Sequence, residues 1–169
     1  MLEIINNLRP FFEDCYRRIN VREYSRIMKI SPPTSSKILS EYKKKGLLLI
    51  ERDRNYFFYY ANRNNEIFID LSRIYWKLKL QNLINFMNRN LTSPTIILFG
   101  SLSKAEAKND SDADICVLGY KKELNITKFE TDLKRKIQLF SFNSLQDIKN
   151  KELTNNIING YVLAGRLRL

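Results

Sequence analysis

Apolar residues recur every three or four positions in the first part of the chain, the spacing that places side chains on one face of a helix. The stretch Ile4–Phe12 shows it first, although Pro10 favours a helix that starts there and ends whatever precedes it. A second short helix is predicted over Val21–Met28. Ser31 is a typical N-cap and Gly46 a typical left-handed stop, so a third helix is expected between them.

A hairpin and a long helical stretch follow. Leu47–Ile50 and Tyr56–Ala61 are predicted strands, because the polar turn Arg52–Asn55 separates two runs of large apolar residues. From Glu66 to about Asn88 the chain has no proline or glycine and keeps helical spacing. That stretch predicts one long helix, or two with a slight break.

Strands alternate with helices in the second half, which indicates an α/β unit. The predicted strands are Thr95–Phe99, Asp112–Leu118 and Ile137–Phe142. The predicted helices are 102–107, 129–136 and 145–158, before a short element over 161–169. We therefore predict an α+β protein. Its predicted segments are an N-terminal domain over 1–64, a linker or dimerisation helix over 65–91, and a small α/β domain with a mixed sheet over 92–169.

Composition narrows the chemistry that the chain can perform. Its 169 residues include no histidine, which excludes a histidine base, a Ser-His pair and a His-ligated metal. Catalysis would have to rest on carboxylates, lysines, hydroxyls and hard metal ions. Two cysteines, Cys15 and Cys116, are too few for a disulfide framework or a zinc cluster, and we expect both to be buried and inert.

The formal net charge of +11 favours a polyanionic partner, nucleic acid first and an anionic membrane surface second. A merely solvated, lysine-rich surface is the alternative. The apolar runs are far too short to cross a bilayer, and the N-terminus lacks the basic and apolar segments of a signal peptide. We therefore expect a cytoplasmic protein with no membrane partner.

Three helices followed by a hairpin is the order of a winged helix-turn-helix domain. On the third helix, small hydroxyls and lysines gather on the face opposite the apolar residues, as a helix in a DNA groove requires. The residues expected to contact DNA are Thr34, Ser36, Lys37, Ser40 and Lys44 of that helix and Arg52 and Arg54 of the hairpin turn. The segment Asn20–Asn65 resembles winged-helix regulators of the MarR and ArsR type. This resemblance implies DNA binding, and docking to another protein is the alternative use of such a fold.

The apolar stripe of the long helix either packs on this domain or pairs with a second copy. Winged-helix proteins often pair in this way, and two-fold proteins match two-fold DNA sites. We therefore predict a homodimer.

A second motif lies in Ile96–Leu118, with the sequence IILFGSLSKAEAKNDSDADICVL. Gly100 allows a tight turn from strand to helix, and free N–H groups of a helix that begins near Ser101 suit phosphate. Asp112 and Asp114 are alternate residues of a strand, so both carboxylates point to one face. Two carboxylates on one face suit Mg²⁺, which prefers oxygen ligands and bridges to substrate phosphates.

This motif resembles the minimal nucleotidyltransferases of the polymerase β superfamily, over roughly residues 85–165. The resemblance implies that Asp112 and Asp114 are catalytic metal ligands and that Gly100, Ser101 and Lys104 bind nucleotide. It further implies transfer of a nucleoside monophosphate from an NTP to an acceptor hydroxyl, with Mg²⁺ as cofactor. Small proteins of this family are often paired with toxin proteins, so an antitoxin with a toxin partner is a further interpretation.

The chain departs from the family pattern at one position. The family usually supplies a third carboxylate from the next strand, where the stretch KIQLFSF has the neutral Gln138. Asp132, Asp147 or Glu106 could substitute, but none stands at the expected place. The sequence therefore leaves two interpretations open, which are an active transferase and a regulator whose second domain binds nucleotide without turnover.

Overall fold

The structure is a computed structural model that describes residues 3–119 and 124–167. The chain forms two compact units, and each is described by itself. The first contains the chain up to Tyr75 together with Ala105–Asn109. The second contains Trp76–Lys104 and the chain from Asp110 onward.

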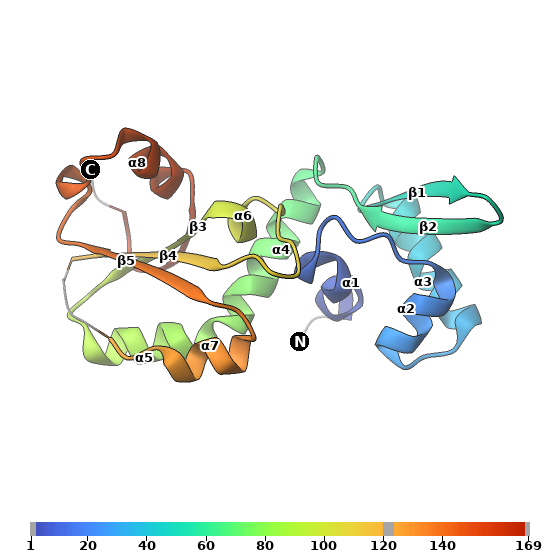
Figure 1. Ribbon diagram of the computed structural model, residues 1–169, viewed down its shortest axis with the longest axis horizontal. Helices are drawn as coiled ribbons and strands as arrows, with labels where there is room; N and C mark the ends of the chain where they lie inside the picture. Colours follow the sequence, from blue (N-terminus) through green and yellow to red (C-terminus); the bar gives the residue numbers. More distant parts are fainter. Residues whose placement is uncertain (1–2, 120–123, 168–169) are drawn as a thin grey trace. The chain divides into compact units, whose positions relative to one another are not determined.

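The first unit contains three helices and a hairpin, and it ends inside the helix that follows the hairpin (Figure 1). The helices are α1 (Glu3–Glu13), α2 (Val21–Met28) and α3 (Pro32–Lys44), and the antiparallel hairpin is β1 (Leu48–Asp53) with β2 (Tyr56–Ala61). Between α1 and α2 the chain adds one antiparallel bridge, in which the Ile19 N–H donates to the Tyr59 carbonyl at 2.9 Å. The predicted order of helices and strands is confirmed.

The expectation for Pro10 was wrong, because α1 continues through it. A proline inside a helix costs about 3 kcal/mol. Its missing N–H would have bonded to the carbonyl of Asn6, an exposed residue whose carbonyl can meet water instead. Four large side chains of α1 are fully buried, and each stabilises the fold by about 1.5–3 kcal/mol, so burial outweighs the lost bond.

The limits of α3 follow from its caps. The Ser31 hydroxyl accepts a hydrogen bond from the Thr34 N–H at 3.3 Å, and Gly46 leaves the helix with a φ of +71°. Leu39 and Tyr42 on α3 are buried. The Tyr42 hydroxyl accepts a hydrogen bond from Asn7 Nδ2 at 3.1 Å, which fixes α3 against α1. The predicted cap and stop of this helix are both confirmed.

The predicted long helix is two helices, α4 (Glu66–Lys79) and α5 (Gln81–Asn90), with a break at Leu80. Asn65 caps α4, since its Oδ1 accepts from the Phe68 N–H at 3.0 Å. None of the helices in residues 3–119 and 124–167 combines the length and apolar character needed to traverse a bilayer.

The second unit is built around a four-stranded mixed sheet (Figure 1). Its strands are β3 (Thr95–Phe99), β4 (Ala113–Leu118), β5 (Ile137–Phe142) and β6 (Tyr161–Ala164), in the order β5-β4-β3-β6. Strands β4 and β5 are parallel, whereas β3 is antiparallel to both β4 and β6. The predicted mixed sheet is therefore confirmed.

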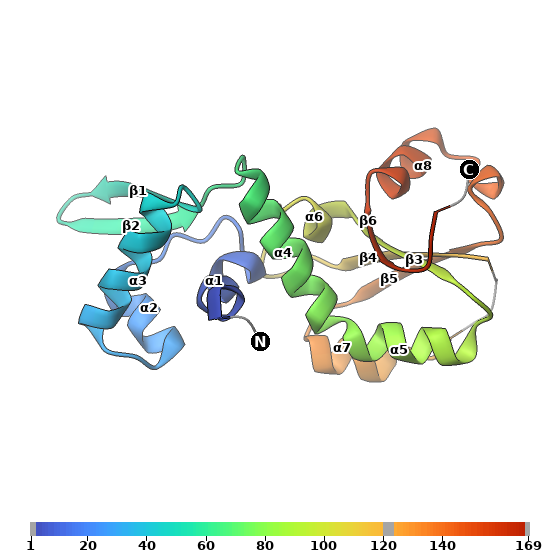
Figure 2. The same cartoon turned by 180° about the vertical axis from the view of Figure 1, so that it is seen from behind.

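Helices cover both faces of this sheet. Helices α5 and α7 (Thr127–Leu133) lie on one face, and α8 (Lys151–Ile158) lies on the other, next to the 3-10 turn η1 (Leu145–Asp147) (Figures 1 and 2). Cys116 belongs to the core under α8. Burial raises the pKa of this thiol to about 12. Cys15 is also buried, so the predicted burial of both cysteines is confirmed.

Two predicted helices end earlier than expected, and a third is divided in two. The helix expected over 102–107 is the single turn α6 (Gly100–Ser103), because Ala105 adopts a left-handed φ of 55° and the chain then joins the first unit. There the Cys15 N–H donates to the Ala107 carbonyl at 2.7 Å. Lys134, with a φ of 57°, ends α7, and the stretch 145–158 divides into η1 and α8.

Candidate active site

Gly100 forms the turn at the end of β3. Its φ is +69°, a left-handed conformation that costs most other residues about 1–2 kcal/mol. The neighbouring strand adds a second requirement, because Asp114 lies opposite Phe99 in the β3–β4 ladder. A Cβ atom on Gly100 would lie 2.1 Å from the Asp114 carboxylate oxygen Oδ2. Only glycine therefore satisfies both the backbone angle and the space left by this carboxylate.

Three polar side chains meet where β4 and β5 begin. The parallel register aligns Asp114 with Gln138, and Gln138 Nε2 donates to Asp112 Oδ2 at 2.8 Å. Asp112 was predicted to be the first residue of this strand, but it stands just before β4. The structure therefore brings together Gly100, both aspartates and Gln138.

The two aspartates differ in their surroundings. Burial raises the pKa of Asp114 above its usual value, and the negative charge of Asp112 raises it further. Both side chains are partly exposed, so a ligand can reach them. Two carboxylates that repel each other favour a cation between them, since a nearby positive charge stabilises the ionised form.

A protein-family model described as Polymerase beta, Nucleotidyltransferase matches residues 81–167. The matched stretch is slightly more than half of the chain and includes the turn at Gly100 and both aspartates. The chain belongs to the polymerase beta nucleotidyltransferase family. Nucleotidyl transfer is thus the activity of its family, and the matched stretch starts with α5, inside the segment predicted as a linker. No curated protein and no solved structure matches the chain.

The carboxylates of this nucleotidyltransferase domain fit Mg²⁺ only together with a substrate. Within residues 3–119 and 124–167, no group of three or more His, Cys, Asp or Glu residues could hold a metal ion. Asp112 and Asp114 supply carboxylate oxygens, and Mg²⁺ is commonly bound by one or two carboxylates plus substrate phosphates. The donor set therefore fits a metal that arrives with a nucleotide.

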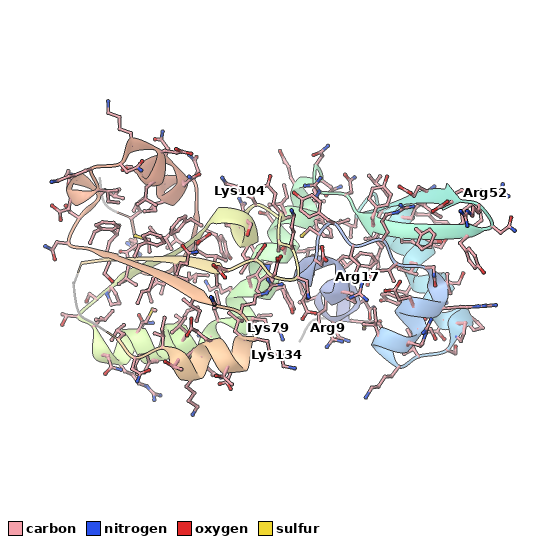
Figure 3. The ribbon with its side chains drawn as sticks, viewed as in Figure 1. Arg9, Arg17, Arg52, Lys79, Lys104 and Lys134 are labelled. Atoms are coloured by element: carbon pink, nitrogen blue, oxygen red, sulfur yellow. The ribbon has the colours of Figure 1, made fainter. Side chains whose placement is uncertain are left out.

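The other predicted nucleotide-binding residues lie on α6 and at its end. Ser101 follows Gly100 and is partly buried. Lys104 is exposed, and its ammonium donates to Asn156 Oδ1 on α8 at 3.1 Å (Figure 3). With a single turn, α6 has a weaker dipole than the longer helix that was predicted.

Sequence reasoning missed two supporting residues. Asn156 holds Lys104 from 52 positions away, and no local pattern marks such a contact. Arg135 donates to the Ser111 carbonyl at 2.6 Å, and its guanidinium lies 5.1 Å from the centre of the Trp76 ring. Arg135 thereby fixes the residue before Asp112. The position of Arg135 just before a strand was a sequence signal for this role, but an arginine at such a position is also typical of an ordinary charged surface.

The acidic residues considered as substitutes for Gln138 have other surroundings. Asp147 Oδ2 accepts from the Ser144 N–H at 3.0 Å within the cap of η1. Asp132 lies on α7, which covers the face of the sheet opposite α8 (Figure 1), whereas Asp114 shares a face of β4 with Cys116 of the core under α8. Glu106 belongs to the segment that packs with the first unit.

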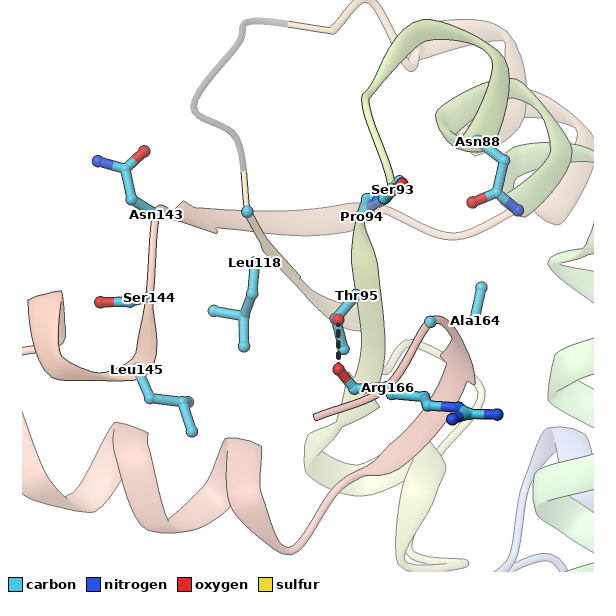
Figure 4. A pocket seen from close by; sticks show the side chains of 12 residues that line it. Asn88, Ser93, Pro94, Thr95, Leu118, Asn143, Ser144, Leu145, Ala164 and Arg166 are labelled. Atoms are coloured by element: carbon cyan, nitrogen blue, oxygen red, sulfur yellow. Dashed lines mark hydrogen bonds between the residues drawn. The ribbon is translucent and has the colours of Figure 1, made fainter. Parts of the chain in front are cut away.

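A cavity of about 680 Å³ lies in the second unit, away from the carboxylates. It is bordered by Thr95 and Leu118, at the opposite ends of β3 and β4 from Gly100 and Asp114 (Figure 4). The Thr95 hydroxyl donates to the Arg166 carbonyl at 2.8 Å and so ties β3 to the segment after β6. This cavity is separate from the candidate site.

In the first unit, the predicted DNA-contacting side chains lie on α3, near the end of β1 (Arg52) and in the β1–β2 turn (Arg54). Ser40 is partly exposed and the other six are exposed. Arg52 lies at the tip of the hairpin, and its Nε donates to the Arg54 carbonyl at 3.1 Å (Figure 3). Arg54 has a left-handed φ of 53°.

Proposed function

We propose that this protein transfers a nucleoside monophosphate from an NTP to an acceptor hydroxyl. The observation that carries the proposal is the pair Asp112 and Asp114 beside the side-chain-free turn at Gly100, in a domain of the nucleotidyltransferase family. The two carboxylates would hold Mg²⁺, which neutralises phosphate charge when bound. The acceptor oxygen forms a bond to the α-phosphorus, the bond to the bridging oxygen breaks, and pyrophosphate leaves.

The residues of the chain would contribute by positioning. The absence of a side chain at Gly100 lets phosphate approach the backbone, and the Ser101 hydroxyl donates a hydrogen bond to a phosphate oxygen. Lys104, held by Asn156, adds a positive charge near the triphosphate. Gln138 is a neutral amide and cannot take the proton of the acceptor hydroxyl, so that proton passes to water.

Transfer of label from α-labelled NTPs tests the proposal. With Mg²⁺ present, we expect labelled product from the natural chain and a loss of about 100-fold or more in Asp112→Asn. Asp110→Asn is the matched control, because Asp110 is an exposed aspartate two positions earlier and lies outside the site. Equal activity in Asp112→Asn and in the control would exclude the proposed site.

Binding of nucleotide without turnover is the second candidate, favoured by the hydrogen bond from Gln138 to Asp112. That bond occupies one lone pair of a proposed metal ligand, and the neutral amide stands in place of the third acid. If this candidate holds, calorimetry detects Mg²⁺-dependent NTP binding while no label is transferred. Gln138→Asp, which restores an acid there, should then create transfer; continued inactivity with intact binding would argue against Gln138 as the cause.

We further propose that the first unit binds DNA as a winged helix-turn-helix domain. Support comes from the order of its elements and from the exposed hydroxyls, lysines and arginines on α3 and the hairpin turn. We expect affinity to fall steeply with salt, and Lys37→Ala to weaken binding. Lys128→Ala, an exposed lysine of the other unit, is the control. If the affinity for DNA does not change with salt, docking to another protein is favoured instead. The toxin partner stays a prediction.

A further inference from the structure

Helix α4 exposes a stripe of aliphatic side chains. Ile67, Leu71, Ile74 and Leu78 are separated by four, three and four residues, so they lie on one face of the helix. Ile67 is 64% exposed, Leu78 43% and Ile74 37%, and Leu71 is partly exposed. We name these four residues the α4 stripe.

Another side of α4 is packed within the chain. Phe68 and Tyr75 are fully buried, with their ring centres 5.1 Å and 5.4 Å from that of Phe12 on α1. A surface helix normally has one apolar side and one polar side. Helix α4 is apolar on two sides, and the α4 stripe stays exposed to water. Contiguous exposed apolar residues of this kind mark interaction surfaces.

The charges beside the α4 stripe point to its partner. Glu66 and Asp70 in the first half of α4 are acidic, whereas Arg73 and Lys77 in the second half are basic. Helical spacing places all four on the same flank of the stripe. When two helices pair antiparallel, like flanks face each other and run in opposite directions. The acidic half of one copy then meets the basic half of the other, for example Glu66 with the partner's Lys77. Asp70 already pairs with Arg73 of its own helix at 3.0 Å.

We propose that the α4 stripe pairs antiparallel with the α4 stripe of a second copy of this chain. Ile67 then packs on the partner's Leu78, and Leu71 on the partner's Ile74, around a two-fold axis at the middle of the stripe. Such an interface uses the same patch on both copies, so the patch must be complementary to itself. The α4 stripe and its flank meet this condition only when the helices are antiparallel. The pairing specifies the surface of the predicted homodimer and does not depend on nucleotidyl transfer.

Disulfide trapping in the full-length chain tests the arrangement. Ile67→Cys and Leu78→Cys are prepared separately and oxidised mildly, alone and mixed. In the antiparallel pair, like positions lie roughly 16 Å apart along the helix, beyond the reach of a disulfide. We expect a cross-linked dimer in the mixture and on the order of tenfold less from either variant alone. The natural chain, whose two cysteines are buried, gives the background.

Light scattering at micromolar concentration provides the second test. We expect a mass twice that of the 20.1 kDa chain, and a dissociation constant raised by about tenfold or more in Ile74→Lys. Ile158→Lys is the matched control, because Ile158 is an exposed isoleucine on α8 with 42% of its surface accessible. Circular dichroism checks that both variants fold. A monomeric natural chain, or cross-linking of each cysteine variant with itself, overturns the proposal.

Discussion

Replacing Gly100 with alanine should disturb the geometry of the site strongly while lowering the stability of the domain only slightly. The added Cβ atom would stand 2.1 Å from Asp114 Oδ2, whereas ordinary contact begins near 3.4 Å. The carboxylate must therefore move by about 1.3 Å, and a misplacement of about 1 Å can lower a rate by about 100-fold. The left-handed backbone adds about 1–2 kcal/mol of strain.

Gly46→Ala is the control for this strain. Gly46 has a φ of +71°, close to the +69° of Gly100, but a Cβ there would meet its nearest atom, Asn65 Nδ2, at an ordinary 3.6 Å. The backbone penalty is thus the same and the crowding is absent. About 1 kcal/mol lowers the melting temperature of a chain of this size by roughly 2–4 °C.

Calorimetry with Mg²⁺ and NTP, together with thermal unfolding, measures both effects. Both variants should lose a few degrees of melting temperature, and only Gly100→Ala should lose nucleotide binding or transfer. Unchanged binding and transfer by a folded Gly100→Ala variant would refute the idea that the Asp114 carboxylate needs the space left by glycine.

Three further predictions concern stability and reactivity. Asn65→Ala removes the cap of α4 and should cost about 1 kcal/mol of unfolding free energy in a urea titration, whereas no change would mean that water replaces the cap. Leu39→Ala leaves a cavity at a fully buried position of α3 and should cost about 2–5 kcal/mol in the same titration, and a cost below about 1 kcal/mol would contradict this packing. Because its pKa is near 12, Cys116 should stay protonated and unlabelled by a thiol reagent at pH 8 until the chain is denatured, and rapid labelling of the folded protein would disprove its burial.

Local signals in the sequence predicted much of this fold. The strands β3 and β5 have the predicted bounds, because each is a short apolar or β-rich run between polar segments. The cap at Ser31 and the stop at Gly46 were also predictable, since both depend on the chemistry of one residue. Gly100 and the two aspartates could be found because their spacing is local.

Features set by distant contacts were not predictable. Pro10 stays inside α1 because burial of neighbouring side chains outweighs a local preference for breaking the helix. Helix α6 stops after one turn because the chain turns to pack with residues near Cys15. The local motif marks Lys104, but the contact of Lys104 with Asn156 depends on where α8 packs. In each case tertiary packing decides between conformations that the local sequence allows.

Because β4 pairs with β5, the charge at position 138 can change without a change in the backbone of either strand. Glutamine and glutamate have nearly the same shape, and their codons differ by a single base. Because Gln138 already touches Asp112, exchanging its amide for an acid would alter the charge at that point while leaving the backbone of both strands in place. A single-base change could therefore turn the two-acid site of this chain into a three-acid site, or the reverse.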